Sequence, residues 1–305
     1  MKAAGRDDED PEAVAVAAIE RAIDGAPDDP RGYAVYGDFL SQRGDPRGEL
    51  IALQLLPSLD RAQRERVKAL LYQPTIRCLP GPLSQWRWGF VHTATLLRPM
   101  AVPEPVDLGA LLAHPSLRFV RALTLGQEPL ADALRTLGGA APRALSSLTV
   151  YAPREFALSQ VPTTLPALER LGLSVPQVSG RLPALPKLRA LELAYVDFGA
   201  EHDEALFGEN RLGLTEVKLV VSQEVERPLL DAALRLPNLT VFTLEAQRSG
   251  APFVEALEAS PALSRLTRLD LQRSGLTERS ARRLLALSRH MPRLTDLLLG
   301  DAPWP

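Results

Sequence analysis

The chain has 305 residues, of which 46% are hydrophobic and 24% are charged, and its formal net charge is -2. This composition lies outside the low-hydrophobicity, high-charge range of disordered proteins, so we expect the chain to fold. A nearly neutral chain has no overall attraction to nucleic acid or to an anionic membrane surface, and we expect neither as a partner.

The first ten residues, 1–10, are polar and charged, and they predict a disordered tail. They are acidic where an export signal is basic, and no apolar run approaches the roughly 20 residues that span a bilayer. Cys78 is the only cysteine, which excludes an intrachain disulfide and a cysteine-based zinc site. These features favour a cytoplasmic protein.

Residues 11–72 carry four successive helical patterns and predict a compact helical module. In the first pattern, Val16, Ile19 and Ile23 fall on one helical stripe. Breaks rich in Gly, Pro and Asp separate the patterns. The helices are expected after Pro11, after Pro30, from Pro46, and over 60–72.

Residues 73–305 contain a repeated L-x-x-L-x-L pattern with about eight copies. The middle positions of the copies are Leu123, Leu148, Leu171, Leu191, Val217, Phe242, Leu269 and Leu297. Successive copies are therefore 20 to 28 residues apart, which matches the 20–29 residue period of leucine-rich repeats.

In an extended strand, alternate side chains face opposite ways, so the last two apolar residues of each copy point to one side together. One copy cannot bury them alone, whereas stacked copies form a continuous core. The predicted fold class is α/β: a leucine-rich-repeat solenoid with a parallel sheet on its concave face, helices or irregular turns on its convex face, and an all-α N-terminal module. A convex helix is expected after Thr277, whereas earlier proline-bearing links such as 174–186 are expected to be irregular or a single helical turn.

The eight copies resemble leucine-rich repeats, and the longer C-terminal ones resemble the ribonuclease-inhibitor class. Residues 28–54 resemble the bacterial repeat-companion domain, a module that precedes such repeats. The matching segments are Asp29-Pro30-Arg31, Tyr36-Gly37-Asp38-Phe39-Leu40, Gly44-Asp45-Pro46-Arg47-Gly48-Glu49, Leu53-Gln54 and, further along, Trp86-Arg87-Trp88-Gly89-Phe90-Val91. The resemblance implies a bacterial intracellular repeat protein, and that family has no settled biochemical activity.

One departure from the repeat pattern concerns the position three residues after the last leucine, where Asn or Cys usually hydrogen-bonds neighbouring turns. The residues found there are Glu128, Pro153, Pro176, Val196, Ser222, Gln247, Ser274 and Ala302. We therefore expect no asparagine ladder and uneven curvature.

Residues that point outward from the predicted concave sheet are the candidate partner-binding site, because a rigid scaffold presents them side by side. They are Ser147, Thr149, Tyr151, Arg170, Glu192, Glu216, Lys218, Thr243, Glu245, Arg268, Asp270, Gln272 and Asp296. The alternative is that these are solvated strand residues with no binding function.

No motif for catalysis, phosphate binding or metal binding is present, and the four histidines lie far apart. We therefore predict no catalytic residue, no metal, no cofactor and no small-molecule substrate. The carboxylates Glu201, Asp203 and Glu204 are interpreted as a solvated loop, with a paired acid/base role as the alternative.

Two further groups have two possible interpretations. The alternating aromatics Trp86, Trp88 and Phe90 favour a strand that caps the solenoid, with a stacking platform as the alternative. The arginines of the last helix suggest either a basic patch for an acidic partner or a solvated face. They are Arg279, Arg282, Arg283 and Arg289.

The sequence favours an intracellular adaptor or recognition protein that binds a protein partner through the concave face, and not an enzyme. An inhibitor or regulator that occludes a specific enzyme is the alternative. A hydrolase with a cryptic site is a third, more remote hypothesis.

Overall fold

The computed structural model describes residues 11–79, 83–97, 107–126, 129–194, 206–208, 213–221 and 225–300. It is a mixed α/β structure that divides into two compact units. The helical unit comprises 1–95, 107–121 and 142–144, and the sheet unit comprises 96–106, 122–141 and 145–305. The predicted tail 1–10 and the predicted acidic loop at Glu201 to Glu204 lie outside the described residues, and the predicted boundary between residues 72 and 73 stays a prediction.

The four helices predicted at the start of the chain are confirmed. They are α1 (Pro11–Gly25), α2 (Pro30–Gln42), α3 (Pro46–Gln54) and α4 (Arg61–Leu71). An aspartate precedes each of the last three helices, and its side chain accepts a hydrogen bond from a backbone N–H of the first turn. Pro30 and Pro46 sit in the first turn, where proline loses no helical hydrogen bond.

The core of the helical unit is aromatic. Tyr36 stacks on Phe90 with ring centroids 5.7 Å apart, and Phe119 meets Phe90 edge-on at 4.8 Å. Phe90 begins β2 (Phe90–Leu97), which pairs antiparallel with β1 (Ser84–Arg87). Trp88 and Gly89 form the two-residue turn between these strands with φ of 49° and 81°, the positive values that a tight hairpin favours.

Residues of the segments 28–54 and 86–91 bring α2, α3 and this hairpin together. Gln54 accepts a hydrogen bond from the Gly89 backbone N–H at 2.8 Å. A Cβ on Gly48 would lie 2.6 Å from the Ser41 nitrogen and 2.7 Å from the Gly37 oxygen, so only glycine permits this approach of α3 to α2. These residues have structural roles in the helical unit.

The sheet unit carries a parallel sheet whose strands follow one another in chain order. The strands are β3 (Ala122–Gly126), β4 (Ser147–Tyr151), β6 (Arg170–Ser174), β8 (Ala190–Ala194), β9 (Glu216–Val221), β10 (Val241–Ala246), β11 (Arg268–Arg273) and β12 (Asp296–Leu299). The middle residues of the repeated pattern pair from strand to strand throughout, from Leu123 to Leu297. Between β4 and β8, the two-residue strands β5 (Phe156–Ala157) and β7 (Val178–Ser179) pair as a second small sheet.

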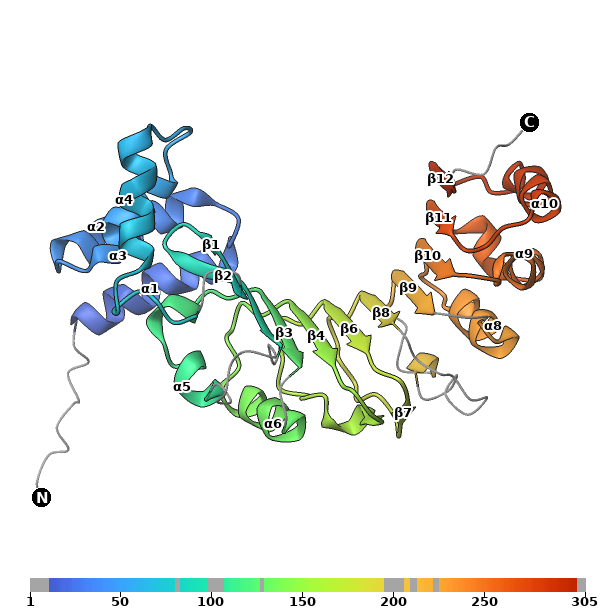
Figure 1. The fold of residues 1–305 in the computed structure, drawn as a ribbon, viewed down its shortest axis with the longest axis horizontal. Coiled ribbons are helices and arrows are strands. Elements are labelled where there is room, and N and C mark those ends of the chain that lie inside the picture. The colour runs from blue at the N-terminus through green and yellow to red at the C-terminus, as the bar shows by residue number, and fades with distance from the viewer. Residues whose placement is uncertain are drawn as a thin grey trace, which may run out of the picture. The chain divides into compact units, whose positions relative to one another are not determined.

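Helices cover one side of this sheet, as Figure 1 shows. They are α6 (Leu130–Ala140), α8 (Arg227–Arg235), α9 (Gly250–Glu258) and α10 (Glu278–Ser288). The inward-facing apolar residues of β3 to β11, such as Leu148 and Leu269, are buried, whereas those of the last strand, β12, are half-buried. The core of the sheet unit is therefore a continuous row of apolar side chains along the strands.

The prediction of a helix after Thr277 is confirmed, since the Thr277 hydroxyl accepts a hydrogen bond from the Ser280 N–H at the start of α10. The prediction of irregular links before it holds for 175–189 apart from the two-residue strand β7, but it is wrong for the links that contain α6, α8 and α9. Proline suggested irregular structure there. Pro129 is instead the N-cap of α6, and Pro228 lies in the first turn of α8, where proline is compatible with a helix.

A ladder of threonines runs across the end of the sheet at which the strands begin. Each hydroxyl donates a hydrogen bond to the backbone oxygen of the equivalent residue in the preceding strand segment. The donor–acceptor pairs are Thr215 to Arg189 (3.3 Å), Thr240 to Thr215 (3.2 Å), Thr267 to Thr240 (3.1 Å) and Thr295 to Thr267 (3.0 Å). The same oxygens also accept backbone N–H bonds, so the ladder fixes the register at which each new strand starts.

Candidate functional site

The predicted partner-binding residues all lie on described strands and alternate with apolar residues, which are buried on β4 to β11 and half-buried on β12. On β4, Leu148 and Val150 are buried while Ser147 and Thr149 are half-buried and Tyr151 is exposed. The same alternation holds along β9 to β11. We call this side of the sheet the polar face. It consists of Ser147, Thr149, Tyr151, Arg170, Glu192, Glu216, Lys218, Thr243, Glu245, Arg268, Asp270, Gln272 and Asp296, together with Arg273.

Ion pairs between strands organise the middle of the polar face. Lys218 on β9 contacts Glu192 on β8 at 3.1 Å and Glu245 on β10 at 3.2 Å. Partial burial works to lower the pKa of Lys218, but hydrogen bonds from its ammonium to these two carboxylates raise it above its usual value. Lys218 is therefore firmly protonated at neutral pH and joins three neighbouring strands.

A second ion pair joins β6 to β9 across the strand β8 that lies between them. The register places Arg170 opposite Ala190, and Ala190 opposite Glu216. Because alanine is small, the long Arg170 side chain crosses above β8 and contacts Glu216 at 3.0 Å. At the C-terminal end of the face, Arg268 lies 3.8 Å from Asp270.

The sequence did not identify Arg273 as part of this face. The register shifts between Thr243 and Glu245 and brings Arg273 opposite Glu245. Arg273 contacts Glu245 at 3.4 Å. A bulge of this kind leaves no mark in an alternating pattern. The threonine ladder has a signal in the sequence, because a threonine follows the first leucine of each of the last four copies of the repeated pattern.

The first strands of the polar face are uncharged. Ser147, Thr149 and Tyr151 on β4 lie beside Gly172 and Ser174 on β6, in register. The Thr149 hydroxyl lies 3.0 Å from where a Cβ of Gly172 would be, so the two strands are closely packed at this point. Tyr151 on β4 is a large, partly apolar side chain, and it is 42% exposed.

The remaining candidates are distributed along the face. Thr243 is in register with Lys218 and Asp270, and the Gln272 N–H donates to the Asp270 carboxylate at 3.2 Å. Asp296 is exposed on the terminal strand β12, whereas Ser147 lies on β4, with five strands between them. The face thus brings together the charged residues of β6 to β11, but not its two ends.

Two of the four arginines named on the last helix form ion pairs. Arg282 pairs with Glu278 of the same helix, and Arg283 pairs with Glu258 and Glu255 of α9. These contacts connect α9 to α10 and favour the interpretation as a solvated structural face.

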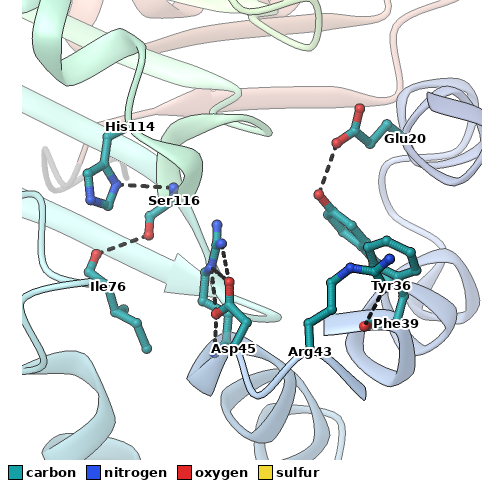
Figure 2. A network of polar contacts seen from close by, with 9 residues as sticks. Glu20, Tyr36, Phe39, Arg43, Asp45, Ile76, His114 and Ser116 are labelled. Carbon is teal, nitrogen blue, oxygen red and sulfur yellow. Dashed lines mark hydrogen bonds and ion pairs between the residues drawn. The ribbon is translucent and has the colours of Figure 1, made fainter. Parts of the chain in front are cut away.

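The helical unit contains several polar contacts at low exposure, which Figure 2 shows. The Tyr36 hydroxyl donates to the Glu20 carboxylate at 2.9 Å, and Arg118 also pairs with Glu20. The buried Ser116 hydroxyl donates to the Ile76 oxygen at 3.0 Å, while its N–H donates to Nδ1 of His114. These polar groups hold segments of the unit together and leave no nucleophile exposed among them.

The alternating aromatics also point into the helical unit. Phe90 is 1% exposed, and Trp88 packs against the same core, with its ring 4.8 Å from that of Tyr33. Trp86 packs against the buried cluster that contains Leu50. A stacking platform that uses all three rings is therefore wrong.

The described residues contain neither a candidate metal site nor a candidate membrane span. None of the described ranges contains a cluster of three or more His, Cys, Asp or Glu side chains that could hold a metal ion. Within the same ranges, no helix is long and apolar enough to cross a membrane. Burial raises the pKa of the Cys78 thiol to about 11, which makes it a poor nucleophile at neutral pH.

No protein-family model matches the chain, and no curated protein matches it. Among solved structures, the crystal structure of a structural-genomics target from Bacteroides fragilis aligns with a TM-score of 0.44 and 19% sequence identity. The alignment covers 60% of this chain and 61% of that chain, so this chain spans about three fifths of the length of that protein. A likeness of this size carries no conclusion about function.

Proposed function

We propose that the chain is a leucine-rich-repeat protein with an N-terminal repeat-companion module, and that it acts as a cytoplasmic adaptor which recognises a protein partner through the polar face. The repeat assignment is supported by the strand-to-strand pairing of the repeated apolar positions and by helices on one side of the sheet. The cytoplasmic location is supported by the single, half-buried cysteine.

The observation that carries the proposal is the continuous row of polar side chains on a rigid sheet. Because the leucines beneath are buried at nearly zero exposure, the strands that present this row are fixed. Ion pairs already hold Lys218 and Arg170 in place, so these long side chains lose little conformational entropy when a partner docks.

The chemistry of the face favours a protein partner over a polyanion. Each of its cations pairs with a carboxylate, so the surface offers alternating charge and not a positive track for phosphates. Alternating charge selects partners by complementarity, and an exposed tyrosine such as Tyr151 is a typical anchor at the centre of a protein interface.

Site-specific photo-crosslinking in cells that express the full chain tests the proposal. A crosslinking amino acid is placed at Tyr151 or Glu192 on the polar face, and at Arg282 on the helix side as the matched control. We expect one protein to be captured from both polar-face positions and not from Arg282.

The captured protein is then purified and its binding measured against variants. Charge reversal of Lys218 should weaken binding at least tenfold, and charge reversal of Arg282 should leave it unchanged. Equal capture from all three positions, or full affinity after reversal at Lys218, would contradict the proposal. If the captured protein is an enzyme, addition of the pure chain to its activity assay distinguishes an inhibitor from an adaptor.

A further inference from the structure

The last strand of the sheet, β12, is apolar on both of its sides. Leu298 is in register with Asp270 of β11 and, further along the same row, with Lys218 of β9, so it points to the side of the polar face. Its neighbours Leu297 and Leu299 point to the helix side. A leucine on β12 thus occupies a row that carries charged residues on β9 and β11.

The helix-side leucines of β12 are less buried than their counterparts on β11. Leu297 and Leu299 are half-buried, whereas Leu269 and Leu271, with which they are in register, are at most 1% exposed. The difference arises because β11 lies between two strands, while β12 is the last strand in the described sheet. Apolar surface therefore stays in contact with water at this edge, where its burial would be favourable.

The outer edge of β12 also offers backbone hydrogen bonds. The Asp296 N–H donates to the Thr267 oxygen at 3.1 Å, so the backbone groups of Asp296 point toward β11. Successive residues of a strand point these groups to opposite edges, so Leu297 and Leu299 direct theirs outward, and no described strand pairs with that edge. Edge strands are usually protected from pairing by lysine, proline or a bulge, and β12 contains none of these.

The helix layer continues the apolar surface. Arg283 pairs with Glu255 and Glu258, so its side of α10 faces α9. Leu285 lies two positions further, on the opposite side of the helix, and it is 47% exposed. Figure 1 shows α10 as the last helix of the row that begins with α8, at the same end of the sheet as β12. We call Leu285, Leu297, Leu298 and Leu299 the β12 edge surface.

We propose that a second copy of the chain pairs with β12 in antiparallel orientation, about a two-fold axis through Leu298. A two-fold interface must be complementary to itself, and the run of three leucines reads the same in both directions. Leu297 of one copy lies opposite Leu299 of the other, and the two exchange backbone hydrogen bonds. Asp296 lies opposite Gly300, which has no side chain, so no like charges meet across the strands.

A second copy suits this edge better than a strand of a different protein. Leu298 meets Leu298 of the second copy on the axis, so the one apolar residue in this row of the polar face is covered by its own equivalent. On the other side, the α10 helices of both copies flank the same axis, where Leu285 can be covered. The dimer carries two polar faces on one continuous sheet, and its formation does not depend on what the polar face binds.

Sedimentation of the full chain over a series of concentrations tests the proposal. We expect the mass to rise from that of one copy to that of two. Leu298→Lys places two like charges on the axis and should raise the dissociation constant of the dimer at least tenfold. Gln272→Lys is the matched control, because it adds the same charge at an exposed position of β11, and it should leave the dimer unchanged. Circular dichroism checks that both variants are folded.

A disulfide tests the register of the pairing independently of that substitution. In a Cys78→Ser background, Leu298→Cys places the two thiols on the axis, where the opposed Cα atoms are about 4.5 Å apart, within the range that a disulfide bridges. Mild oxidation should therefore link the two copies. Asp296→Cys is the control on the same strand, because its two thiols would be separated by roughly 13 Å along the strands and should not be linked.

Three results would each overturn the proposal. The first is a chain that sediments as one copy up to the highest concentration at which it stays dissolved. The second is a dimer that Leu298→Lys does not weaken, which would place the contact elsewhere on the surface. The third is a disulfide that forms as readily from Asp296→Cys as from Leu298→Cys, which would exclude an axis through Leu298.

Discussion

Removal of one hydroxyl from the core of the helical unit should destabilise it by about 2 kcal/mol, the usual contribution of a buried hydrogen bond to a charged group. The change is Tyr36→Phe. The Tyr36 hydroxyl donates to the Glu20 carboxylate at 2.9 Å, and both residues are almost fully buried. Phenylalanine keeps the ring that stacks on Phe90 and meets Phe119 edge-on, so the substitution isolates the hydrogen bond from the packing.

Urea unfolding followed by the fluorescence of Trp86 and Trp88 measures this loss, because both rings belong to the helical unit. In a Glu20→Gln background the same substitution should cost only about 1 kcal/mol, since the acceptor is then neutral. Tyr72→Phe is the control: Tyr72 is 69% exposed, and its hydroxyl should contribute less than about 0.5 kcal/mol. The reasoning fails if Tyr36→Phe is as mild as Tyr72→Phe, or if its cost is the same with Gln at position 20.

Three further predictions address other features. Gly48→Ala should destabilise the helical unit by roughly 3 kcal/mol in the same urea assay, because the added Cβ would clash with backbone atoms of α2. Gly139→Ala should instead stabilise α6 by about 0.5–1 kcal/mol, because the added Cβ has no atom within 4 Å. The pKa of Lys218 is raised in the folded chain, so its ion pairs should contribute fully to stability below pH 10.5. That contribution should be lost as the pH rises through the pKa of the folded chain. Circular dichroism melts across this pH range should show a steeper loss of stability for wild type than for Lys218→Met. Cys78, with a pKa of about 11 against an ordinary 9.0, should react with iodoacetamide about 100-fold more slowly at pH 8 than in urea-unfolded protein, and equal rates would show that the thiol is not shielded.

Much of the local structure could be predicted because local chemistry encodes it. The Asp-Pro pairs at residues 29–30 and 45–46 mark helix starts, since the aspartate caps the helix and the proline fits its first turn. The alternation of Leu148, Thr149 and Val150 predicts both the strand and the direction of each side chain, which the structure confirms.

The structural features that could not be predicted depend on contacts between segments that are distant in sequence. The link from Pro129 onward was misread because proline ends a helix in one context and begins one in another, and only the following Leu130, Leu134 and Leu137 distinguish the two. The contact of Arg170 with Glu216 needs the small Ala190 between them, and the contact of Arg273 with Glu245 needs a bulge. Neither is visible from the spacing of residues along the chain.

The threonine ladder makes the sheet modular. Thr240 and Thr267 occupy equivalent places, and each donates its hydroxyl to the backbone of the strand segment before it. Deletion of 241–267 would join Thr240 to Arg268, so Thr240 would take the place of Thr267 without a change in its own contact to Thr215. In a protein built in this way, a whole unit can be removed or added at the threonines while the hydroxyl contact between successive strand starts is preserved.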